Sequence, residues 1–199
     1  MIGNQPSAYF EDVRLQRWPW SIERVNNLDQ PYVTAGNRVY SVATQHGEFT
    51  EVGKRQPGEM SGVWDHPMKL LDGFWLGVTF GHTELGRASE KMHWLTRASR
   101  WQMTPGQVEI AYRLPNLDLC RREYGVDDYE GLVVRLELTN RSKKRLPLTL
   151  HFLARTDLRS AWLGEDRLIW RDGRDEAVYL DEPGCIAGYN TTNLAYVLL

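Results

Sequence analysis

The 199-residue sequence has few cysteines and no long apolar run, and each absence excludes a class of protein. Its two cysteines, Cys120 and Cys185, lack the spacing of a metal or redox motif, which argues against a disulfide scaffold or a zinc site. No apolar run approaches the ~20 residues that a membrane-spanning helix requires. The N-terminal residues also lack the basic and apolar regions of a secretory signal. These features predict a cytoplasmic protein that has no membrane partner.

The sequence also has no excess of positive charge. It carries 24 Lys and Arg against 26 Asp and Glu, which gives a formal net charge of −2. Basic residues are scattered, apart from a short run over residues 141–145. A nucleic-acid-binding protein usually carries a basic face, so no nucleic-acid partner is expected. The basic run is interpreted as a solvated turn, with an anion contact as the alternative.

Motifs for cofactors and for autonomous catalysis are missing as well. The sequence has no glycine-rich phosphate loop, no nucleophile elbow and no paired-cysteine motif. Its histidines are too dispersed along the chain to suggest a metal site. We therefore predict no metal, no cofactor and no complete catalytic machinery within this chain.

Alternating apolar residues are abundant, whereas convincing amphipathic helices are almost absent. Three segments repeat with period two, at 108–114, 132–138 and 148–154, which is typical of strands with one buried face. A hairpin is expected over 31–43. Further strands are expected at 74–80, 94–103, 167–171, 177–181, 185–189 and 193–199, with a short turn at 68–71. The fold class predicted is all-β, a large antiparallel β-sandwich.

The domain organisation predicted is one domain with an N-terminal extension. Residues 1–30 are rich in Pro, Asn and Gln and are expected to form an irregular arm. Residues 31–199 form the β-sandwich domain. The last seven residues make an apolar strand pattern with no polar tail, so we expect the chain to be truncated before a further domain.

One stretch, Gly58 to Phe80, gathers most of the residues that could carry chemistry. Its sequence is GEMSGVWDHPMKLLDGFWLGVTF. The candidate substrate-binding or domain-interface residues are Trp64, Asp65, His66, Lys69, Asp72 and Trp75. Glycoside hydrolysis needs two carboxyl groups, a histidine can serve as a base, and aromatic rings stack on sugars. The alternatives are structural: tryptophans fill cores, and Lys69 can pair with Asp65 or Asp72.

The same stretch, followed by GLVVRLELTNRSKKRLPLTLHFLARTDLRSAW, resembles the N-terminal domain of bacterial glycosidases with a catalytic α/α toroid. The groups it is most similar to are the processing α-glucosidases, the mannosylglycerate hydrolases and the glycogen-debranching amylo-α-1,6-glucosidases. The resemblance covers most of the chain from about Pro31 onward. It implies a galactose-mutarotase-like supersandwich, and catalytic carboxylates that lie beyond Leu199.

Three functional hypotheses follow. The first is a non-catalytic domain that packs on the C-terminal catalytic toroid of the same polypeptide and helps to shape the cleft for an oligo- or disaccharide. The second is a stand-alone carbohydrate-binding module that uses exposed tryptophans. The third is a mutarotase-like sugar epimerase, in which a histidine and a carboxylate transfer protons.

Overall fold

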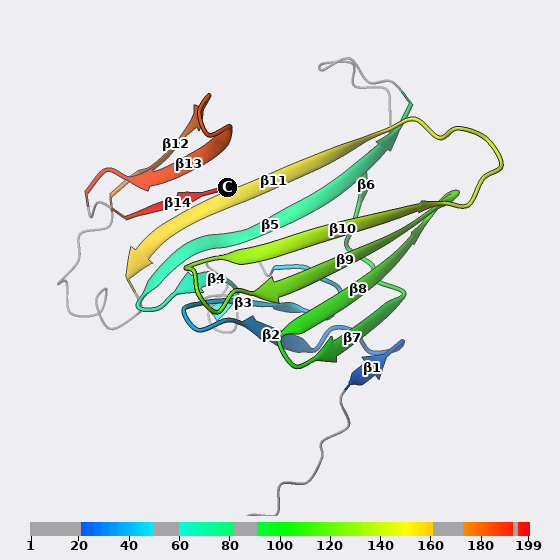
Figure 1. Ribbon diagram of the computed structural model, residues 1–199, viewed down its shortest axis with the longest axis horizontal. Coiled ribbons are helices and arrows are strands. Elements are labelled where there is room, and N and C mark those ends of the chain that lie inside the picture. The colour runs from blue at the N-terminus through cyan, green and yellow to red at the C-terminus, as the bar shows by residue number, and fades with distance from the viewer. Residues whose placement is uncertain (1–20, 50–59, 82–90, 161–172, 193–194) are drawn as a thin grey trace, which may run out of the picture.

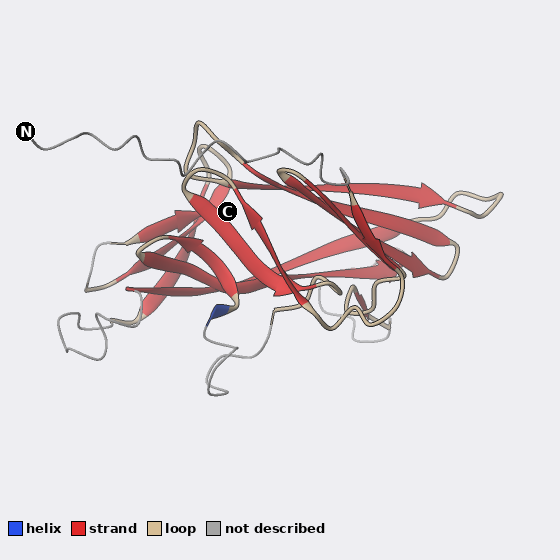
Figure 2. Ribbon diagram, turned by 90° about the horizontal axis from the view of Figure 1, so that it is seen from below, coloured by secondary structure: helices blue, strands red, loops and turns tan. Residues whose placement is uncertain are grey.

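The computed structural model describes residues 21–49, 60–81, 91–160, 173–192 and 195–199. Nearly all of these residues lie in antiparallel strands, which form two large sheets and one small sheet (Figures 1 and 2). The all-β class predicted from the sequence is therefore confirmed. The strand predicted at 167–171 and the first 20 residues of the arm lie outside the described residues.

The first large sheet has five strands in the order β1-β7-β8-β9-β10. These strands are β1 (Ile22–Arg24), β7 (Arg100–Thr104), β8 (Gln107–Leu114), β9 (Leu117–Gly125) and β10 (Leu132–Asn140). Every neighbouring pair is antiparallel, and short turns join β7 to β8 and β8 to β9. Among the described residues, β10 pairs only with β9, so it ends the sheet on one side.

The second large sheet has the order β11-β5-β4-β3-β2, with β6 beside β5. Its strands are β2 (Pro31–Ala35), β3 (Val39–Thr44), β4 (Gly62–Asp65), β5 (Met68–Phe80), β6 (His93–Trp94) and β11 (Leu148–Ser160). A small third sheet contains β12 (Asp175–Leu180), β13 (Cys185–Asn190) and β14 (Tyr196–Leu198). β14 supplies Val197, which packs against the core together with Leu199.

The two large sheets enclose one apolar core. Its buried residues come from both layers: Val39, Phe74, Leu76 and Val78 from the second sheet, and Val108, Ile110 and Leu119 from the first. In β5 the residues Phe74, Leu76 and Val78 point inward, as the period-two pattern predicted. The sandwich is thus held by apolar burial between two pleated faces.

The structure corrects several details of the sequence prediction. The arm is not irregular throughout, because Ile22–Arg24 pairs with β7 as β1. The short turn expected at 68–71 is wrong, since these residues begin β5. The strand expected over 94–103 is two strands, β6 and β7, separated by an irregular segment. The sequence analysis predicted no strand at Leu117–Gly125, where the structure has β9.

Candidate functional site

The β4–β5 hairpin carries all six candidate residues, but it does not bring them to one surface. Trp64 is buried, stacks on Tyr40 with centroids 6.3 Å apart, and donates from Nε1 to the Met60 carbonyl oxygen at 3.1 Å. Its ring also lies 5.7 Å from Lys69 Nζ. Trp64 is therefore a buried side chain that covers Lys69, and its contact with a sugar or a partner domain stays a prediction.

Lys69 is the centre of a buried ion cluster and has a relative exposure of 0%. Its Nζ lies 2.8 Å from Asp72 Oδ1 and 2.9 Å from Asp157 Oδ2. Arg155 Nε approaches Asp72 Oδ2 at 3.1 Å, and Arg159 Nε approaches Asp157 Oδ2 at 2.8 Å. The structural alternative, in which Lys69 pairs with Asp72, is the one found.

The two carboxyl groups of this cluster differ in their electrostatic environment. Burial raises the pKa of Asp72 above its ordinary value, although the hydrogen bond from Lys69 opposes this. Burial also raises the pKa of Asp157, but the hydrogen bonds and positive charges of Arg159 and Lys69 outweigh it and lower the net value. The cluster is a fixed network that joins β5 to β11, because each carboxylate meets two cations.

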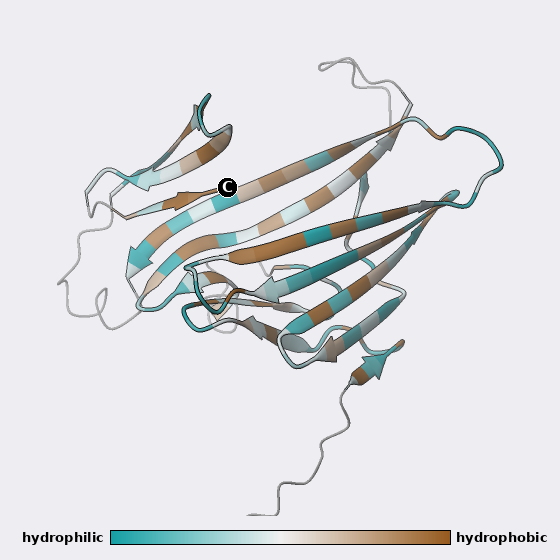
Figure 3. Ribbon diagram, in the orientation of Figure 1, coloured by the Kyte–Doolittle hydropathy of each residue, from teal (hydrophilic) through white to brown (hydrophobic). Residues whose placement is uncertain are grey.

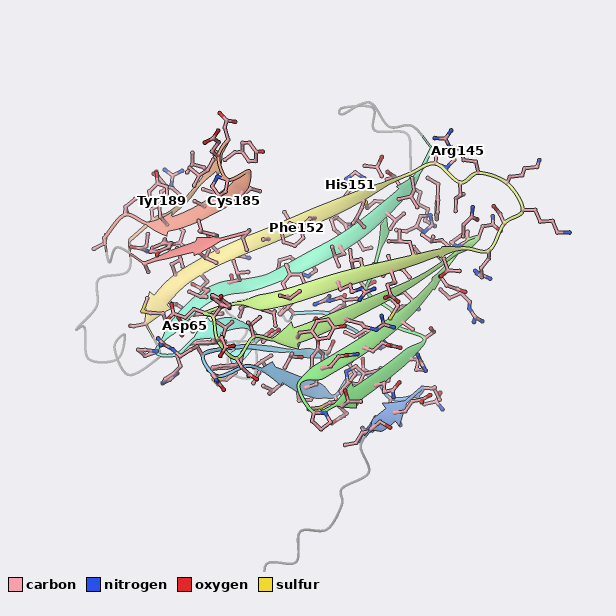
Figure 4. All side chains as sticks on the ribbon, in the orientation of Figure 1. Asp65, Arg145, His151, Phe152, Cys185 and Tyr189 are labelled. Carbon is pink, nitrogen blue, oxygen red and sulfur yellow. The ribbon has the colours of Figure 1, made fainter. Side chains whose placement is uncertain are left out.

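Two candidates lie at the β4–β5 turn, the half-buried Asp65 and the exposed His66. Asp65 Oδ1 is 3.8 Å from Arg38 Nε, and Arg38 also pairs with Glu130 at 2.9 Å. His66 is exposed in the turn (Figure 4 labels the adjacent Asp65). His66 is therefore the candidate that another molecule can reach, whereas the Asp65 carboxylate is partly covered.

Trp75 lies on the opposite face of β5 from the core residues Phe74 and Leu76. It pairs across the strands with Leu153, and its ring contacts Phe49 edge-on at a centroid distance of 6.1 Å. Two residues further along this face is Gly77, which pairs with Trp94. A Cβ at Gly77 would lie 3.1 Å from Trp94 Cε3, so the indole lies over the glycine while Trp94 keeps a relative exposure of 41%.

Polar groups lie beside Trp94 on the same face. His151 pairs with Gly77 across the strands, and its Nε2 lies 3.0 Å from Thr79 Oγ1. Trp75, Trp94, His151 and Thr79 form the outer aromatic face of the second sheet. Of these four residues the sequence reading selected Trp75 alone, because strand pairing, which brings Trp94 and His151 to it, is not visible in a single sequence.

A second buried charge cluster was missed by the sequence analysis. Arg121 (1% exposed) and Glu123 (0% exposed) form an ion pair on the inner face of β9. Tyr32 Oη donates to Glu123 Oε1 at 3.0 Å, and Arg121 Nη1 donates to the Gly47 carbonyl oxygen at 3.0 Å. The guanidinium lies 4.3 Å from the Phe74 ring centroid. The charged residues interrupt the apolar alternation of β9, which explains why this strand escaped prediction.

The ionisation of this second cluster is fixed by its neighbours. Burial would lower the pKa of Arg121, but the charge of Glu123 raises it above its ordinary value. Burial and the charge of Glu123 raise the pKa of Tyr32 well above its ordinary value. Arg121 therefore stays charged at neutral pH, while the phenol of Tyr32 stays protonated and donates its hydrogen bond to Glu123.

An apolar cleft of about 710 Å³ opens between β10 and β11. Its lining comes from six strands and their flanking residues: Val39, Val63, Asp65, Met68, Leu70, Leu71, Phe74, Glu130–Leu132, Val134, Phe152 and the C-terminal residues 195–199. Figure 3 shows how much of β10 is apolar, and Figure 4 shows Phe152 on β11 between Asp65 and Arg145.

The described ranges contain neither a metal site nor a membrane-spanning helix. There the His, Cys, Asp and Glu side chains form no group of three that could hold a metal ion. No helix within these ranges is long and apolar enough to cross a bilayer. Comparisons of the chain with protein-family models, with curated proteins and with solved structures gave no match.

Proposed function

We propose that this chain is a non-catalytic β-sandwich domain of an α-glycosidase, of the glycogen-debranching or α-glucosidase-like type. In this role it packs on a helical catalytic domain and helps to shape the cleft that holds an oligo- or disaccharide. The proposal starts from the sequence resemblance of Gly58–Phe80 and the segment that begins at Gly131. The all-β fold is compatible with it.

One observation carries the non-catalytic part of the proposal. The buried acid and base groups of Gly58–Phe80, Asp72 and Lys69, form an ion pair with each other. Lys69 also pairs with Asp157 and has no exposed surface. A general acid or base must reach a substrate proton directly or through one water. A lysine with no exposed surface, enclosed with its carboxylates, does not meet that requirement. The network instead fixes the shape of the β4–β5 hairpin.

The exposed turn of this hairpin is the surface that we assign to the catalytic domain. Asp65 and His66 stand at its tip, and the buried ion cluster holds the strands behind them. A turn that is braced by a rigid network can present polar side chains to a neighbour without a large entropic cost. This arrangement favours a role in which the β4–β5 turn contacts the catalytic domain at the edge of its substrate cleft.

The direct test is an assay of the purified 199-residue chain on maltose and longer α-glucosides, with glucose release as the readout. We expect no hydrolysis above the buffer blank, because the proposal assigns the catalytic carboxylates to the helical domain. Turnover by this chain that disappears in Asp65→Asn would contradict the proposal, since it would make Asp65 part of a working site.

A second candidate function, a carbohydrate-binding module, is favoured by the outer aromatic face. The Trp94 ring lies close to Gly77 and is partly exposed, and the half-buried His151, held by the buried Thr79, offers a polar ring on the same face. Sugar rings have apolar CH faces that stack on aromatic rings, while their hydroxyls need polar partners. This surface replaces Trp64 as the place where such a module would bind.

For this second candidate, Trp94→Ala is the informative variant. If the outer aromatic face binds sugar, maltoheptaose will change the tryptophan fluorescence of the natural chain, and Trp94→Ala will weaken the binding about tenfold or more. Tyr196→Ala is the matched control, because Tyr196 is an exposed aromatic residue of the small sheet. A flat titration of the folded natural chain would exclude this function.

A further inference from the structure

We propose that the cleft between β10 and β11 is a binding site for a small apolar amine, a molecule with a hydrocarbon body and one ammonium group. The proposal does not depend on the glycosidase assignment, because it concerns the space between the sheets and not the contact with another domain. It is carried by three observations: the walls of the cleft, its apolar lining, and two carboxylates that share one cation.

The first observation is that strands of this chain form the walls of the cleft. The second sheet contributes residues such as Phe74, and the first sheet contributes Val134. The C-terminal residues 195–199 form a further wall. This wall is anchored, because the backbones of Leu199 and Ile186 exchange two hydrogen bonds, at 2.9 and 2.8 Å. A space of about 710 Å³ within such walls lies in the size range of small-molecule sites.

The second observation is how few polar side chains line the cleft. Apart from Asp65 and Glu130, the lining consists of Val, Leu, Met, Phe, Ala and Gly residues and one tyrosine, Tyr196. A sugar in this space would leave most of its hydroxyl groups without hydrogen-bond partners, which is unfavourable. The lining therefore fits a hydrocarbon body. It does not fit the oligosaccharide of the proposed function.

The third observation is the charge of the lining. Asp65 and Glu130 carry it, and no Lys, Arg or His belongs to the lining within the described ranges. Arg38 contacts both carboxylates from outside the lining: its Nη2 is 2.9 Å from Glu130 Oε1, whereas its Nε is 3.8 Å from Asp65 Oδ1, too far for a hydrogen bond. Asp65 Oδ1 is buried and receives no hydrogen bond from the described residues. One cation thus serves two carboxylates, and the cleft stays negative beside Asp65.

This negative charge identifies the polar group of the ligand. A carboxylate among apolar side chains is stabilised by a nearby cation, and Arg38 compensates Glu130 more closely than Asp65. An ammonium group would supply the missing positive charge, while its hydrocarbon body would fill the apolar lining. A fatty acid would instead bring a further carboxylate to the same place, where like charges repel. The ligand class is therefore an apolar amine.

The test is isothermal titration calorimetry of the 199-residue chain at neutral pH with three probes that share a decyl chain. The probes are decylamine, 1-decanol and decanoate, each below the concentration at which it forms micelles. We expect decylamine to bind at least about tenfold more tightly than decanoate, with 1-decanol between them. Because the hydrocarbon part is constant, the order of the three probes reports the charge of the site.

Two variants that conserve side-chain size should change decylamine binding in opposite directions. Asp65→Asn should weaken it about tenfold and leave 1-decanol binding unchanged, since only the ammonium senses the lost charge. Arg38→Gln should strengthen it, because it removes the cation that competes for the two carboxylates. The Arg38 side chain is 59% exposed, so its replacement should not disturb the core.

A variant that fills the cleft tests the place of binding. Val134→Phe enlarges a half-buried side chain of the lining and should weaken the binding of decylamine and 1-decanol alike. Val33→Phe is the matched control, because Val33 is 46% exposed on β2 and does not line the cleft. Circular dichroism verifies that each variant is folded. If Val134→Phe does not fold, the Asp65 and Arg38 variants still decide the proposal.

Three outcomes would overturn the proposal. Decylamine could fail to bind at concentrations up to about 1 mM. Decanoate or 1-decanol could bind as tightly as decylamine, which would show that the site does not recognise the ammonium group. Decylamine could also bind equally to the natural chain, Asp65→Asn and Val134→Phe, which would place its site elsewhere. None of these outcomes bears on α-glucoside hydrolysis, so the proposed function is tested separately.

Discussion

Replacing Arg121 with methionine is expected to lower the free energy of unfolding by about 3–5 kcal/mol, as removal of one member of a buried ion pair does. The guanidinium lies between the two sheets, where it pairs with Glu123 and donates to the Gly47 carbonyl oxygen. Its loss leaves the fully buried Glu123 carboxylate without a cation. Urea denaturation followed by tryptophan fluorescence measures the change.

Two further variants decide whether the effect comes from the buried charge. Arg122→Met is the matched control, because Arg122 is the next residue of β9 and forms partly exposed ion pairs with Glu109 and Glu137. Its loss should cost no more than about 1 kcal/mol. The double variant Arg121→Met with Glu123→Leu should regain a large part of the stability. A double variant as unstable as the sum of the two single changes would contradict the account.

Lys69→Met is expected to have a similarly large effect, about 3–5 kcal/mol at neutral pH. Methionine keeps most of the aliphatic volume under the Trp64 ring but removes the cation that Asp72 and Asp157 share. Both carboxylates then lose a hydrogen bond in a buried site. Arg155→Met is the control, because Arg155 is 63% exposed on its side chain although it also contacts Asp72, so its loss should be small.

The Lys69 effect carries a pH signature with a definite sign. In the natural chain the pKa of Asp157 is lowered, so its stabilising contribution is present above the ordinary carboxyl pKa and is lost as the pH falls through the folded value. The pKa of Asp72 is already raised by burial, and removal of Lys69 raises it further. A carboxyl group whose pKa is raised in the folded state destabilises the fold increasingly as the pH rises above the pKa of that group in the unfolded chain.

The stability difference between Lys69→Met and the natural chain should therefore grow from about pH 4 to pH 7. Denaturation curves at several pH values test this. A difference that stays constant over that range would show that Lys69 stabilises the fold by packing and not by its charge.

The overall fold was largely predictable because most strands here have one buried face. In β8 and β10 the period-two alternation is unbroken, so the sequence predicted them directly. β9 was not predicted because Arg121 and Glu123 occupy inward positions where apolar residues are expected. Arg121 and Glu123 can occupy the inner face of this strand only because they form an ion pair with each other.

The candidate site was predictable in its location but not in its arrangement. The sequence pointed to the β4–β5 hairpin, and the structure shows the hairpin tied to β11 by Asp157 and Arg155. These partners are more than 80 residues away in the chain, so local patterns carry no signal for them. The proximity of Trp94 to Gly77 was also missed, because it depends on the pairing of β6 with β5, which no local pattern indicates.

Hydrolysis of α-glucosides by residues 1–199 tests the central claim most directly. We predict that the purified chain releases no glucose from maltose or longer α-glucosides above the buffer blank, because the proposal assigns the catalytic carboxylates to a partner domain. Glucose release by residues 1–199 that Asp65→Asn abolishes would contradict the account.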